Sequence, residues 1–124
     1  MKPKIVKSDS LNEFLTSEGC LIAENYADDH LSIAHATVKP GVTTVKHHLK
    51  EVDEIYIITS GHGEVWVGNL EPAKVGRGDL ILIPAETSQK ITNIGRTDLK
   101  VYCICTPRFT AECYCDEEQN SKKK

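Results

Sequence analysis

The sequence predicts an all-β domain, built as a sandwich or barrel of short antiparallel strands. Three observations support this class: short stretches rich in β-branched residues recur through the middle of the chain, turns containing Gly or Pro separate them, and little of the chain shows helical periodicity. The 124 residues are the size of one domain. A chain of this length buries roughly two-thirds of the surface that its unfolded form exposes, so we expect a core without cross-links.

Composition and charge exclude several classes of partner. The formal net charge is -3, and acidic and basic residues alternate along most of the chain, which argues against a nucleic-acid or anionic-membrane partner. The basic run at 122–124 reads as a solvated tail. No apolar run is long enough to span a bilayer, and the first residues lack the apolar stretch of a signal peptide. Five cysteines, an odd number, fit reduced thiols, so we expect a cytoplasmic protein.

Residues 1–30 are expected to form an N-terminal lead-in that packs on the barrel. Ser10 and Glu13 have the spacing of a capping box, which predicts a short helix ending near Gly19. Weak alternation follows at 20–24, before a polar connection.

Seven strands are predicted in the barrel, which we place at residues 31–106. Pro40 and Gly41 end the first strand and are typical of a type II turn, and the glycine-rich stretch 60–63 predicts a tight hairpin. The pattern fades after Pro107, so 107–124 should be a C-terminal extension of the same domain, in which about the last eight residues do not pack. The expected strands cover 31–38, 43–49, 54–59, 64–68, 80–83, 89–93 and 99–106.

Strand alternation indicates which side chains face the interior. His47 and Leu49 share a face, whereas His48 shares the other face with Lys46 and Lys50, which require water. His47 is therefore predicted to point inward and His48 outward, unless a bulge reverses them. In the last strand, the face that carries Cys103 and Cys105 is the better candidate for the interior.

The spacing of these residues resembles the first of two motifs that define the cupins, small double-stranded β-helix barrels of the jelly-roll class. That motif runs Gly, five residues, His-x-His, three or four residues, Glu, six residues, Gly. Here Gly41, His47, Glu54 and Gly61 occupy the matching positions, and Leu49 stands where the second histidine belongs.

The second cupin motif is matched further along the chain. It runs Gly, five residues, Pro-x-Gly, two residues, His, three residues, Asn. Gly78, Pro84 and Asn93 match it, while Glu86 replaces a glycine and Gln89 replaces the histidine. The resemblance covers roughly residues 31–106 and implies a cupin barrel with a small-molecule pocket.

The resemblance also implies a divalent metal, often iron, manganese, nickel or zinc. Carried over by position, the ligands become His47, Glu54 and Gln89, since Leu49 cannot bind a metal. Two alternatives stay open: a His47–Glu54 hydrogen bond in a pocket without metal, or a catalytic pair in which Glu54 orients His47 as a general acid or base. The residues expected to line the substrate pocket are His35, Leu49, Tyr56, Gln89, Cys103 and Cys105.

Two further features have alternative interpretations. Cys103 and Cys105, with Cys113 and Cys115, offer four thiols for a structural zinc site, but such closely spaced pairs also suit apolar packing or the pocket wall. Arg108 suits either an anionic group at the barrel mouth or a surface ion pair.

Three functions are compatible with this site, and the sequence leaves open whether the protein is an enzyme. The first is a metal-dependent oxygenase, isomerase or lyase that acts on a polar small molecule. The second is a metal-free isomerase or epimerase, and the third is a non-catalytic binding or sensing module. An exposed strand edge, together with the resemblance to small cupins, predicts a homodimer.

Overall fold

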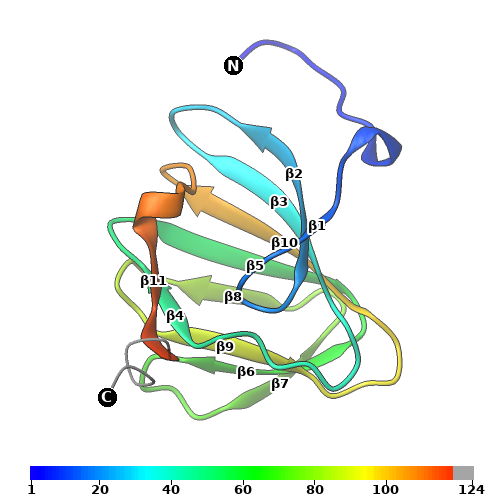
Figure 1. Ribbon diagram of the computed structural model, residues 1–124, viewed down its shortest axis with the longest axis vertical. Coiled ribbons are helices and arrows are strands. Elements are labelled where there is room, and N and C mark those ends of the chain that lie inside the picture. Colours follow the sequence, from blue (N-terminus) through cyan, green and yellow to red (C-terminus); the bar gives the residue numbers. More distant parts are fainter. Residues whose placement is uncertain (119–124) are drawn as a thin grey trace.

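The computed structural model describes residues 1–118, and within them the strands form two antiparallel sheets that face one another (Figure 1). This arrangement confirms the all-β double-stranded β-helix predicted from the sequence. The larger sheet has the order β1 (Phe14–Leu15), β2 (Leu21–Ala27), β3 (Ser32–Val38), β10 (Leu99–Thr106), β5 (Asp53–Ser60) and β8 (Leu80–Ile83). The smaller sheet has the order β11 (Tyr114–Asp116), β4 (His47–Leu49), β9 (Gln89–Asn93), β6 (His62–Val67) and β7 (Ala73–Gly76).

Two glycines set the turns that the sequence predicts. Gly41 has a φ of +79°, and the amide of Val42 donates to the carbonyl of Lys39 at 3.1 Å, which closes the type II turn. Gly61 joins β5 to β6 with a φ of +88°, and a Cβ there would lie 2.6 Å from the carbonyl oxygen of Asp98. Only glycine fits that second position without moving the backbone.

The N-terminal stretch differs from its prediction. In place of a helix ending near Gly19, the chain has a short 3-10 turn at Ser8–Ser10 and then the strands β1 and β2. Gly19, with a φ of +96°, lies in the tight turn between these strands, closed by the hydrogen bond from its amide to the carbonyl of Thr16. Because β2 pairs with β3, part of the expected lead-in is a sheet strand.

The C-terminal stretch also joins the barrel further than predicted. A 3-10 turn at Ala111–Cys113 leads into β11, which pairs with β4 at the edge of the smaller sheet. The carboxylate of Glu117 then contacts His48 and Ser88, at 2.8 Å and 2.7 Å. The packed chain therefore extends into the predicted tail, whereas the lysine run at 122–124 lies outside the described residues.

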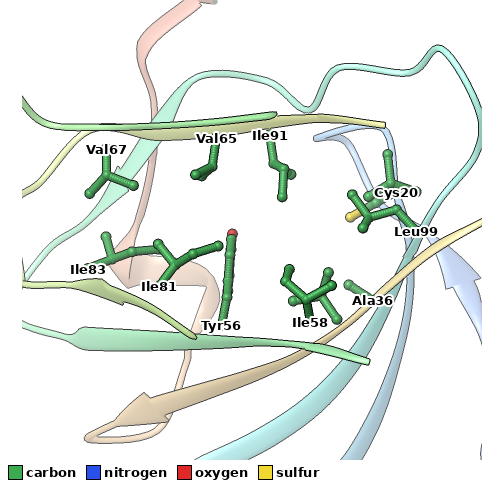
Figure 2. Packing of buried hydrophobic residues seen from close by; sticks show 12 residues of the cluster. Cys20, Ala36, Tyr56, Ile58, Val65, Val67, Ile81, Ile83, Ile91 and Leu99 are labelled. Atoms are coloured by element: carbon green, nitrogen blue, oxygen red, sulfur yellow. The ribbon is translucent and has the colours of Figure 1, made fainter. Parts of the chain in front are cut away.

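The core fills the space between the two sheets. Figure 2 shows Tyr56, Ile58, Ile81 and Ile83 pointing from the larger sheet toward Val65, Val67 and Ile91 of the smaller one. A second, smaller cluster closes the end of the barrel near β11 and contains Leu49, Val52, Cys105 and Cys113. Across residues 1–118, none of the helical segments has the length and apolarity to cross a bilayer.

Candidate functional site

A cavity of about 260 Å³ lies between the sheets, beside the core of Figure 2. Most of its wall is apolar, contributed by β2, β3, β5 and β10. A few ionisable or hydrogen-bonding side chains face into it. Those on which the chemistry depends are Glu18, His47, Glu54, Tyr56, Cys105 and Tyr114.

The N-terminal hairpin supplies one side of this wall. Every second residue from Phe14 to Glu24 lines the cavity, with Thr16, Glu18 and Cys20 in the turn between the two strands. Glu18 and Cys20 come from this side, and the Cys20 thiol donates to the Glu18 carboxylate at 3.4 Å. Sequence reasoning missed Glu18 because it assigned this stretch to a helix.

His47 points inward from β4 and is 3% exposed. Its Nδ1–H donates to the carbonyl of Val45 at 2.7 Å, and its Nε2 lies 3.4 Å from Glu18 Oε2. Its ring stacks on Tyr114 with the centroids 4.9 Å apart. Because Nδ1 carries the proton that the carbonyl accepts, a second proton between Nε2 and Glu18 makes the contact attractive.

His48 faces the other way, as alternation predicts. Its Nδ1 contacts Glu117 Oε2 at 2.8 Å on the outside of the barrel. The structure therefore places His47, and not its neighbour, at the cavity.

Glu54 lies on β5 and is 7% exposed. Its Oε1 accepts a hydrogen bond from the Gln89 amide at 2.9 Å, and its Oε2 faces the Cys105 thiol at 3.6 Å. Burial raises the pKa of Glu54 to about 7, although the hydrogen bond from Gln89 favours the charged form. The carboxyl group can therefore gain or lose a proton near neutral pH.

Gln89 supports Glu54 from behind the cavity wall. Its amide nitrogen donates to Glu54, and its amide oxygen accepts the hydroxyl proton of Tyr56. The side chain is 1% exposed and is not among the residues that line the cavity. Gln89 therefore orients Glu54 and Tyr56, which differs from its predicted role as a substrate contact.

His47 and Glu54 both line the cavity, but they are held in two separate pairs. The carboxylate beside His47 is that of Glu18, while the hydrogen bonds of Glu54 go to Gln89 and Cys105. The direct His47–Glu54 hydrogen bond that the sequence suggested is therefore replaced by two carboxylate clusters on one cavity.

The other predicted pocket residues divide between the cavity and the outer face. Leu49, Tyr56, Cys103 and Cys105 line the cavity. His35 does not: alternation in β3 turns it to the outer face of the larger sheet, where its ring packs edge-on against Tyr102 with the centroids 5.1 Å apart. His35 lies outside the cavity wall because its neighbours Ala34 and Ala36, and not the histidine itself, occupy the inward positions of β3.

The residues present fit a metal ion poorly. Leu49 replaces one ligand of the cupin motif, and both polar atoms of Gln89 are already bonded to Glu54 and Tyr56. In the part of the chain that the structure describes, no three His, Cys, Asp or Glu side chains come close enough to share an ion. This applies equally to the zinc site considered for the cysteines, all five of which are free thiols.

Asn93, the last residue of the second motif, is structural. Its amide nitrogen donates to the carbonyls of Val38 and Thr97, both at 2.8 Å, and its amide oxygen accepts from the amide of Gly95. Glu86 stands where the motif has glycine and keeps the left-handed backbone of that position, with a φ of +67°. These positions preserve the barrel without contributing to the cavity.

The fold and the motif positions define a cupin, and comparison with known proteins agrees. Residues 34–105 match the model of the family described as "Cupin domain", so the chain belongs to that family. An uncharacterized protein from Methanocaldococcus jannaschii is 35% identical over 116 residues, which is 88% of this chain and 92% of that protein.

Solved structures show the same barrel at low sequence identity. KdgF from Halomonas sp. superposes with a TM-score of 0.81 at 16% identity, covering 90% of this chain and 99% of that one. Pac13 from Streptomyces, a nucleoside dehydratase, superposes with a TM-score of 0.77 at 16% identity, covering 93% and 91%. Its variants have been solved with uridine. At this identity the likeness shows the fold alone.

Proposed function

We propose that this protein binds a small molecule in the barrel cavity and catalyses a proton transfer on it, as a lyase or an isomerase. Glu54 acts as the general acid or base, and the His47–Glu18 pair is the second proton-transfer group. The observation that carries this proposal is a buried carboxyl group at the cavity with a pKa of about 7.

The environment of Glu54 suits this role. A general acid or base is most effective when its pKa is near the working pH, and burial brings the carboxyl group there. Gln89 fixes one oxygen of the carboxylate, so the other oxygen is left toward the cavity and the weakly bound Cys105 thiol. The side chain is thus oriented by the protein while one oxygen can reach a ligand.

The His47–Glu18 pair provides a second proton-transfer group, which donates a proton when Glu54 accepts one and accepts a proton when Glu54 donates one. His47 is fixed by the carbonyl of Val45 and by stacking on Tyr114, so its Nε2 stays at the cavity. A reaction that moves a proton from one atom of a substrate to another, or that eliminates water, needs such a pair. The dehydratase activity of Pac13 supports this class by analogy, because the two proteins share the barrel.

Exchange in deuterated water tests the proposal without knowledge of the substrate. We expect the wild-type protein to exchange a carbon-bound proton, or to eliminate water, for a compound within a panel of neutral sugars, nucleosides such as uridine, and amino compounds, followed by proton NMR. Glu54→Gln should reduce the rate about 100-fold or more. Glu71→Gln, at an exposed position in the loop before β7, is the matched control and should not change it.

Two outcomes contradict the proposal. A compound that binds in the cavity without any exchange or elimination would indicate the binding or sensing module considered from the sequence. Turnover that survives Glu54→Gln unchanged would assign the chemistry to other groups.

Metal analysis of protein purified without chelator tests the metal-dependent alternative with His47, Glu54 and Gln89.

We further propose that the protein is a cytoplasmic homodimer. Leu80 and Leu82 of β8 are 61% and 66% exposed at the edge of the larger sheet. On the same outer face they lie beside Ile57 and Ile55 of β5. An exposed apolar edge of this kind favours pairing with a second copy.

A further inference from the structure

The cavity wall has an unequal distribution of charge. Three glutamates line it, Glu18, Glu24 and Glu54, and the part of the wall that the structure describes contains neither lysine nor arginine. Arg108, considered above as a partner for an anion, is not part of this wall and lines a surface depression with Glu51 and Glu112. An anionic ligand would therefore enter an acidic cavity in which His47 is the nearest group able to carry positive charge.

The hydrogen-bonding groups show a second imbalance. The hydroxyls of Thr16, Thr44 and Tyr56 donate to the carbonyls of Cys20 and Ile91 and to the amide of Gln89. These donors are used within the protein, so they are not available to a ligand in the same geometry.

Acceptors with weak partners remain at the cavity, beside one donor that no described residue uses, the hydroxyl of Tyr114. Glu54 Oε2 has only a thiol at 3.6 Å, which is a weak donor. His47 Nε2 and Glu18 Oε2 face one another at 3.4 Å and, without a shared proton, are two acceptors in contact. A donor group with several protons, placed in the cavity, would supply the hydrogen bonds that the cluster beside it lacks.

Aromatic rings complete the surroundings of these acceptors. Tyr56 and Tyr114 line the cavity, as do Phe14 and Phe109, which are both more than a third exposed. The hydroxyl of Tyr114 is buried without a hydrogen-bond partner among the described residues. Aromatic faces near carboxylates are a recurrent environment for organic cations, and an unsatisfied buried hydroxyl indicates a group that the ligand or water supplies.

We infer that the ligand of this cavity is a small organic amine, which places its ammonium group on the acidic wall that carries Glu18 and Glu54 and its apolar body against the aromatic side chains of the same cavity. This inference rests on the cavity assigned under the proposed function and specifies the class of its substrate. The ammonium donates to carboxylate oxygens that are now held by weak thiol donors or by His47, and its positive charge offsets the two glutamates. The same charge would stabilise the ionised form of Glu54, which is the form that acts as a base.

Binding of three molecules with one ring and different polar groups tests the inference. Cyclohexylamine, cyclohexanol and cyclohexanecarboxylate are titrated into the protein at pH 7, followed by amide chemical shifts of residues around the cavity. We expect the amine to bind about 10-fold tighter than the alcohol, and the carboxylate to bind more weakly than both. Glu54→Gln should reduce the affinity for the amine about 10-fold, so that the amine no longer binds more tightly than the alcohol. The affinity for the alcohol should not change.

Two further variants control for folding and for general charge. Glu18→Gln alters a less buried side chain, and it should also reduce the preference for the amine. Glu71→Gln removes one negative charge at an exposed position that does not line the cavity, and it should leave all three affinities unchanged. Amine binding should also lower the pKa of Glu54, whereas alcohol binding should not.

Several results would overturn the inference. The first is a carboxylate that binds as tightly as the amine or more tightly. The second is a preference for the amine that persists in both Glu18→Gln and Glu54→Gln. The third is absence of amine binding at millimolar concentration. Stoichiometric uptake of Mn²⁺ or Zn²⁺ without an amine preference would identify the cation as a metal and overturn it equally. If the carboxylate or the alcohol binds in a way that depends on Glu54, the amine inference fails but the proposed proton-transfer function stands. If the amine binds without any turnover, the proton-transfer function fails but the amine inference stands.

Discussion

Glu54 shows how one side chain acquires its chemistry from its surroundings. A carboxyl group in water is ionised at neutral pH, but the apolar strands around Glu54 disfavour the charge. Gln89 partly offsets this effect and also sets the orientation of the group. The pKa of Glu54 is therefore not a property of the residue alone, since it depends on burial, and the burial depends on the pairing of β5 within the sheet.

The raised pKa of Glu54 predicts a pH dependence of stability. A carboxyl group with a folded-state pKa of about 7 and an unfolded value of 4.5 binds more protons in the folded state between these values. Its contribution is therefore fully present below pH 4.5 and is lost as the pH rises through 7. Relative to Glu54→Gln, the wild-type protein should lose about 3 kcal/mol of unfolding free energy from pH 4.5 to pH 8.

Urea unfolding of both proteins at several pH values measures this difference. The comparison removes the contribution of other carboxylates, such as Glu117, whose pKa is lowered by its hydrogen bonds from Ser88 and His48. Parallel stability curves for the two proteins would contradict a raised pKa.

At the scale of elements, the hairpin from β5 to β6 depends on a close approach of two backbones. The Cβ of an alanine at position 61 would lie 2.6 Å from Asp98 O and 2.9 Å from Leu99 Cα, at a φ of +88°. We expect Gly61→Ala to destabilise the fold by about 3 kcal/mol or more, because both the steric clash and the left-handed backbone oppose it.

Gly41→Ala is the matched control for this hairpin. Gly41 has a similar φ of +79°, but a Cβ there would meet nothing within 4 Å. Its replacement should cost only the backbone strain, about 1 kcal/mol, measured by thermal or urea unfolding. Equal losses in the two variants would show that the contact with Asp98 does not matter.

The barrel elements were predictable because glycine and proline punctuate them, and the N-terminal hairpin was not. Both faces of the stretch 14–24 mix polar and apolar residues, and Glu18 lies in the turn between the strands, so no alternation in the sequence indicates that it lines the cavity. The glycine at position 19, between short β-forming runs, was the signal that could have indicated a hairpin. β11 was missed because a three-residue strand depends on its pairing with β4.

For the whole molecule, motif spacing predicted the family, and with strand alternation it predicted that His47 and Glu54 face the interior, but it did not predict their interactions. The positions of His47 and Glu54 on the inner faces follow from strand alternation, which a sequence reveals. Partners of these residues come from the turn between β1 and β2 and from β9, β10 and β11, which are distant in sequence and reach the cavity only through the closure of the barrel. That is why Glu18 was absent from the predicted site and Gln89 was assigned a contact with substrate.

The exposed edge of the larger sheet predicts the assembly. Light scattering at micromolar concentration should give the mass of a dimer, and Leu82→Lys should convert it to a monomer by placing a charge on the apolar edge. Leu70→Lys, at a position 73% exposed in the loop before β7, is the control and should remain dimeric. A wild-type protein with the mass of a monomer would contradict the proposed dimer.

Direct titration of the Glu54 carboxyl group by carbon NMR tests the central claim most closely. The spectrum of Glu54→Gln assigns the signal, and the wild-type protein is followed from pH 4 to pH 9. A midpoint near 7 is the predicted result, since burial of the carboxyl at the cavity raises its pKa to about that value. A midpoint near the ordinary value of 4.5 would contradict the account, because burial would then not have raised the pKa of Glu54 to the range in which the group both gains and loses a proton near neutral pH.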